Sequence, residues 1–86
     1  MAKPKKYRKK PIVVEAIQWD GDNFEEIYEF TKGNCCLTVD TGKLIIRTLE
    51  GDMGAERGSF VIEGLTGEFY PCREEIFLET YEPVEE

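Results

Sequence analysis

The sequence contains no histidine, and this absence narrows the chemistry that the chain can perform. Histidine is the commonest general base, the usual partner of a hydrolytic nucleophile and the commonest metal ligand. The chain has 86 residues, and a domain of this size buries only roughly 60–65% of the surface that its unfolded form exposes. A deep enclosed active site is therefore not expected, and we predict a protein that is not an enzyme and that carries no cofactor.

Cysteine is scarce, with three residues, two of them adjacent. An odd number with this spacing does not form a disulfide framework. A zinc site would need Cys35, Cys36 and Cys72 together with a carboxylate, but adjacent residues of a strand point to opposite faces. We therefore predict buried structural thiols, no metal site and a reducing cytoplasmic environment.

Long hydrophobic runs are also missing. The basic start of the chain is followed only by Ile12, Val13 and Val14, whereas the apolar core of a signal peptide has about 7–15 residues. No segment approaches the roughly 20 apolar residues of a membrane span. The sequence therefore predicts a protein without a signal peptide and without a membrane partner.

Basic charge is concentrated at the amino terminus. Six of the eleven basic residues lie in the first ten positions, and the remainder carries five basic against eighteen acidic groups, a charge of −13. We therefore divide the chain into a basic flexible arm, residues 1–10, and one domain, residues 11–86. The arm has two interpretations: a solvated terminus that offsets the acidic body, or a nucleic-acid-binding segment. The residues that would contact nucleic acid are Lys5, Lys6, Arg8, Lys9 and Lys10.

The first half of the domain predicts a strand, a helix and a hairpin. Residues 12–19 are rich in β-branched side chains and read as a strand. Asp22 stands three residues before Glu25, the spacing of a capping box, so we predict an amphipathic helix over residues 23–32 that ends at Gly33. Residues 35–39 and 43–50 then form a hairpin.

The second half adds further short strands. Residues 51–58 read as a bent strand or a wide loop, and residues 60–64 and 68–70 as a second hairpin. Pro71 cannot donate to a ladder, so its strand ends there or lies at an edge. Residues 73–77 have room for one helical turn, and the alternating residues 78–82 predict a closing strand.

These elements together predict an α+β fold, with a mainly antiparallel sheet of five or six short strands and one amphipathic helix on one face. Such a sheet leaves edges and part of a face open, and we therefore expect a homodimer.

Aromatic and arginine side chains supply the candidate ligand site. Trp19 and Tyr70 beside Arg57 would stack a planar ligand and hold a phosphate. We predict this site at a subunit interface, for a nucleotide-derived small molecule. The competing interpretation places Trp19 in the core and Tyr70 either in the core or at the surface.

Four segments of the chain resemble a family of very small, uncharacterised proteins of bacteriophages and prophages: residues 7–11, 14–19, 67–72 and 80–84. The carboxy-terminal part also resembles a short bacterial module named for a Pro-Gly-Asp-Tyr-Gly motif. Arg57, Gly58, Ser59 and Phe60 stand where that module has Pro-Gly-Asp and an aromatic residue. The resemblance implies a phage-derived protein of the host bacterial cytoplasm and brings no activity with it.

The leading functional hypothesis is therefore a small binding protein that engages a host or phage protein. A nucleotide-derived ligand, or nucleic acid held by the basic arm, are the alternatives.

Overall fold

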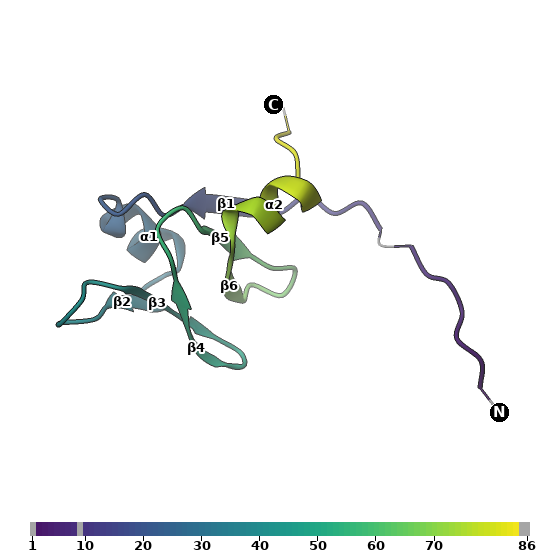
Figure 1. Ribbon diagram of the computed structural model, residues 1–86, viewed down its shortest axis with the longest axis horizontal. Coiled ribbons are helices and arrows are strands. Elements are labelled where there is room, and N and C mark those ends of the chain that lie inside the picture. The colour runs from purple at the N-terminus through teal and green to yellow at the C-terminus, as the bar shows by residue number, and fades with distance from the viewer. Residues whose placement is uncertain (1, 9, 85–86) are drawn as a thin grey trace.

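The computed structural model describes residues 2–8 and 10–84. They form six antiparallel strands and two short helices (Figure 1). The strands are β1 (Glu15–Gln18), β2 (Cys35–Leu37), β3 (Leu44–Thr48), β4 (Gly51–Ala55), β5 (Phe60–Glu63) and β6 (Phe69–Cys72). The helices are α1 (Phe24–Phe30) and α2 (Glu74–Thr80). The α+β class is confirmed, but the prediction of a single sheet is wrong.

The strands form two three-stranded sheets, with the orders β1-β5-β6 and β2-β3-β4. Both predicted hairpins are confirmed, as β2–β3 and β5–β6, and residues 51–58 contain β4 followed by a turn. At that turn Gly58 has a φ of 97°, a conformation that glycine adopts without steric cost. The chain then runs alongside Trp19, whose N–H donates to Ser59 O at 2.8 Å. β5 therefore pairs with β1 rather than with its neighbour in sequence, β4.

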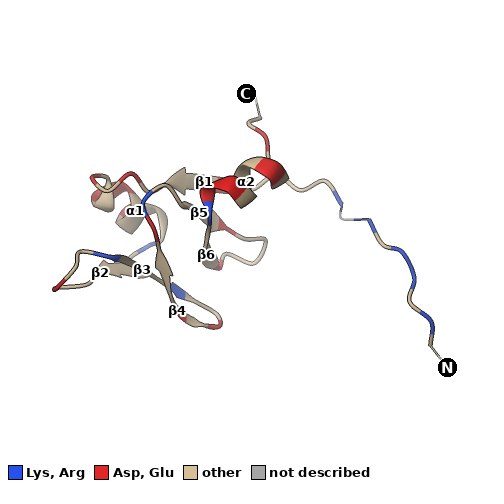
Figure 2. Cartoon of the chain, in the orientation of Figure 1, with Lys and Arg blue, Asp and Glu red and all other residues tan. Residues whose placement is uncertain are grey.

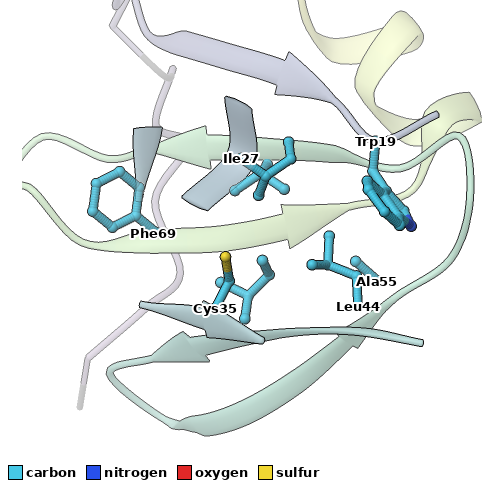
Figure 3. Packing of buried hydrophobic residues seen from close by; sticks show 8 residues of the cluster. Trp19, Ile27, Cys35, Leu44, Ala55 and Phe69 are labelled. Carbon is cyan, nitrogen blue, oxygen red and sulfur yellow. The ribbon is translucent and has the colours of Figure 1, made fainter. Parts of the chain in front are cut away.

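The core lies between the two sheets (Figure 3). Leu44 and Ile46 from β3 meet Val61 and Phe69 from the other sheet, and all four side chains are buried. Ile27 of α1 belongs to the same cluster. Burial of a side chain of this size contributes about 1.5–3 kcal/mol, so this layer holds the sheets together.

Helix α2 covers the opposite face of the β1-β5-β6 sheet. Phe77 stacks on Phe60 at a centroid distance of 3.9 Å and on Tyr81 at 4.8 Å. The predicted closing strand over residues 78–82 is wrong, because α2 continues to Thr80. Phe77 and Tyr81 are four residues apart, a spacing that brings two side chains together at one side of a helix. As a result, both faces of β5 are covered.

Helix α1 confirms the predicted amphipathic helix, but not its cap. Asn23, not Asp22, is the N-cap, and its side chain makes no capping hydrogen bond. The Asn23 amide instead donates to Gln18 O at 2.8 Å, so it ties the start of the helix to the end of β1. The predicted capping box of Asp22 and Glu25 is therefore wrong.

Strand β1 is shorter than the predicted strand over residues 12–19. Its partner β5 ends at Glu63 and the chain then turns at Gly64, so residues 12–14 have no strand to pair with. The described part of the basic arm has no regular secondary structure and extends away from the body (Figure 1).

Candidate functional site

A shallow open groove lies between the two ends of the domain. We call it the terminal groove; it is bounded by residues 10–14, by the turn between β5 and β6, and by residues 80–84, and it encloses about 650 Å³. Its apolar walls are Ile12, Val13, Leu65 and Val84, all of them exposed. Exposed apolar side chains gathered in one hollow are typical of an interaction surface.

Two tyrosines, Tyr70 and Tyr81, line the terminal groove together. Partial burial raises the pKa of Tyr70, and its hydrogen bond with Tyr81 and the negative charge of Glu68 raise that pKa further. Tyr70 therefore stays neutral over a wider pH range than a free phenol, and its hydroxyl remains a hydrogen-bonding group among apolar neighbours.

A second, smaller hollow of about 310 Å³ lies beside Trp19, and we call it the Trp19 hollow. Lys43 and Arg57 both line it. The Arg57 guanidinium lies directly over Gly21, since a Cβ added to Gly21 would stand 2.6 Å from its nitrogens. In the described part of the chain neither cation has a carboxylate within ion-pair distance. The hollow therefore has two positive side chains and one negative side chain, Glu56, beside Trp19.

The predicted ligand group is divided between these two surfaces. Arg57 and Trp19 border the Trp19 hollow, whereas Tyr70 lines the terminal groove. Trp19 is only 5% exposed and belongs to the core cluster, as the competing interpretation expected. Lys43 was not among the predicted site residues, because its only signal in the sequence is its place next to Gly42 in the β2–β3 turn.

The described residues of the basic arm are exposed and carry their charge away from the body (Figure 2). Among the residues predicted to bind nucleic acid, Lys5, Lys6, Arg8 and Lys10 are in this exposed segment, and Lys9 lies outside the described residues. Six of the eighteen acidic groups are on the two helices, Glu25, Glu26, Glu29, Glu74, Glu75 and Glu79, and the other twelve are spread along the rest of the chain. Nucleic-acid binding by the arm stays a prediction.

The three cysteines are separate free thiols. Cys35 is buried in the core, and this burial raises its pKa. Cys36 is exposed on the opposite face of β2, and Cys72 is half-buried in β6. Within residues 2–8 and 10–84, no group of three or more potential ligand side chains is placed to hold a metal ion.

No helix in the described part of the chain is both long and apolar enough to span a membrane. Comparisons of the chain with protein-family models, with curated proteins and with solved structures found no match.

Proposed function

We propose that the protein is a small non-enzymatic binding module that engages another protein through the terminal groove. The observation that carries this proposal is the open groove of about 650 Å³ with exposed apolar walls. The resemblance to phage and prophage proteins makes a phage protein or a protein of the bacterial host the expected partner.

The exposed apolar walls of the groove favour a peptide or loop as its occupant. Leu65 at the tip of the β5–β6 turn is 74% exposed, and Val84 on the other side is 63% exposed. Side chains such as these are costly to leave in water, and their burial contributes about 25 cal/mol for each Å² of apolar surface removed. Tyr70 and Tyr81 add amphipathic groups, which are enriched at protein interfaces.

Charge favours a basic partner. Glu68 and Glu82 line the groove against one lysine, Lys10, and the body beyond residue 10 carries a charge of −13. Complementary charge raises association rates and discriminates against partners of the wrong sign. We therefore expect the partner to present apolar side chains among lysines or arginines.

The test compares three tagged baits in one bacterial lysate, with wild-type protein beside Leu65→Asp and Val39→Asp. Leu65 lines the groove, whereas the fully exposed Val39 lies in the β2–β3 turn. Both changes replace an exposed apolar residue by the same acid, so Val39→Asp controls for charge. We expect a partner that wild type and Val39→Asp retain and that Leu65→Asp loses.

Isothermal titration with the purified candidate then measures the affinity of each bait. A loss of at least tenfold for Leu65→Asp alone corresponds to about 1.4 kcal/mol of binding free energy. If no protein distinguishes Leu65→Asp from the other two baits, the groove is not the binding surface.

A second candidate function is binding of a nucleotide-derived ligand at the Trp19 hollow. Arg57 and Lys43 support it, because they line one hollow without ion-pair partners among the described residues. Two cations in one hollow are suited to hold the phosphate of such a ligand.

A thermal-shift panel of nucleotides tests this candidate, with Arg57→Ala beside Arg47→Ala. Arg47 is an exposed arginine of β3 that does not line the hollow. We expect a melting temperature raised by one nucleotide for wild type and Arg47→Ala only. An equal shift for all three proteins would place the ligand elsewhere.

A further inference from the structure

Strand β1 is an edge strand whose outer side is open. β5 pairs with one side of it, and no strand among the described residues pairs with the other. Trp19 N–H donates to Ser59 O, whereas Gln18 O accepts from the Asn23 side chain. Backbone groups alternate sides along an antiparallel strand. Val14 and Ala16, which share the parity of Gln18, therefore direct their N–H and C=O groups to the open side.

The segment before β1 extends this edge. Ile12, Val13 and Val14 are β-branched residues that favour extended backbone, and the structure leaves them without a partner strand. Edge strands with free backbone groups are templates for pairing with another chain.

The other edges of the two sheets are weaker candidates. Pro71 interrupts β6, and it has no N–H to donate. β2 has three residues, and β4 contains Gly51 and Gly54, which weaken a strand. The edge formed by β1 and residues 12–14 is therefore the longest uninterrupted one.

We infer that this edge pairs in antiparallel fashion with the same edge of a second copy of the chain, with Val14 opposite Val14 across a twofold axis. Residues 12–14 also border the terminal groove, so the second copy lies along one wall of that groove, whereas Leu65 and Val84 belong to its other walls. Pairing joins the two β1-β5-β6 sheets into one continuous sheet of six strands. Symmetric pairing of identical surfaces is the usual route to a homodimer.

The register follows from side-chain chemistry. With Val14 on the axis, Ile12 lies opposite Ala16 of the second copy, and apolar side chains meet on the face that α2 covers. The Asn23 side chain already bonds Gln18 O and the Asp20 N–H, so backbone pairing extends from Ile12 to Ala16, and the basic arm of one copy continues toward the acidic Asp20 of the other. Opposite charges across a strand pair stabilise it, and like charges destabilise it. A register centred on Glu15 instead opposes two carboxylates.

The proposal is tested by the pair of variants Val14→Pro and Val13→Pro. Proline at position 14 removes an N–H that faces the open edge, whereas at position 13 it removes one that faces the other way. Neither N–H belongs to the β1–β5 ladder, which begins at Glu15. A difference between Val14→Pro and Val13→Pro therefore reports only on the N–H group that faces the open edge.

Light scattering coupled to size exclusion, at protein concentrations on the order of tens of micromolar, reads out the mass. We expect wild type and Val13→Pro at twice the mass of the chain and Val14→Pro at the mass of a single chain. A monomeric wild type, or a Val14→Pro variant that remains dimeric, overturns the proposal.

Hydrogen exchange of the wild type gives a readout that does not depend on folding of a variant. We expect the amides of Val14 and Ala16 to exchange at least tenfold more slowly in concentrated than in dilute protein, while amides of β3 do not change. Equal exchange of Val14 and Ala16 at both concentrations overturns the proposal.

Discussion

Phe77 supplies the aromatic contact between α2 and β5, and replacing it by alanine tests how much this contact contributes to the docking of α2. Phe77 makes both aromatic contacts of the stack, with Phe60 at 3.9 Å and with Tyr81 at 4.8 Å. The neighbouring α2 residues Ile76 and Leu78 are exposed. Each aromatic pair contributes about 0.5–1.5 kcal/mol beyond burial. The substitution therefore removes about 1–3 kcal/mol from the docking of α2.

The expected consequence is local. A helix of this length is not stable alone, so loss of the stack detaches α2 and leaves the core between the sheets in place. The Tyr81 N–H, which donates to Phe77 O at 2.8 Å, reports this opening. We expect its hydrogen exchange to accelerate about 5- to 150-fold, which is the same 1–3 kcal/mol expressed as an equilibrium constant.

Two controls separate local opening from global unfolding. Ile76→Ala changes an exposed residue of the same helix and should leave the exchange of Tyr81 unaltered. Ile27→Ala creates a cavity in the core, where Ile27 is 0% exposed, and should lower the free energy of unfolding by about 2–5 kcal/mol. Local opening of α2 is refuted if Phe77→Ala lowers the urea midpoint as much as Ile27→Ala does while hydrogen exchange at Tyr81 stays slow.

Three further predictions concern titration, thiol access and the arm. Because the pKa of Tyr70 is raised in the folded protein, its contribution to stability is complete below about pH 10, the pKa of the unfolded chain, and is lost as the pH rises through the folded pKa. The substitution Tyr70→Phe should therefore flatten the decline in the free energy of unfolding at alkaline pH. A decline that is the same in wild type and in Tyr70→Phe argues against this. A thiol reagent should label the exposed Cys36 first and the buried Cys35, whose pKa is raised, only on unfolding. Mass spectrometry measures the order of labelling, and labelling of Cys35 in the folded protein contradicts the prediction. If the arm binds nucleic acid, deletion of residues 1–10 should abolish a gel shift that weakens steeply with salt, whereas a shift that survives the deletion removes the arm from consideration.

The elements that sequence predicted well are those specified by local physics. Helix α1 ends at Phe30, two residues before the predicted end at Lys32, but Gly33, predicted as the left-handed stop, has a φ of 84° and its N–H donates to Tyr28 O at 2.8 Å. The β5–β6 hairpin lies between its predicted strands because a glycine again supplies a positive φ at the turn, in this case 85° at Gly67. In both cases the preference lies within a few consecutive residues.

The errors are those that depend on distant partners. Residues 78–82 alternate like a strand, yet Phe77 has Phe60 to stack on, and this contact favours a helix. The separation into two sheets depends on β5 choosing β1, and no local signal near Gly58 specifies that choice. The division of Arg57 and Tyr70 between two surfaces follows from the same pairing.

One of the two sheets joins a strand that is synthesised early to strands that are synthesised much later. β2, β3 and β4 are consecutive, whereas β1 waits for residues about 40 positions later, as the Gln18 to Gly58 hydrogen bond shows. Contacts between distant residues form late because closing the intervening loop costs entropy. We therefore expect the middle of the chain to acquire structure on the ribosome first. Ile17 and Trp19 would stay exposed until β5 emerges, so the newly made amino-terminal third is the segment most in need of a chaperone.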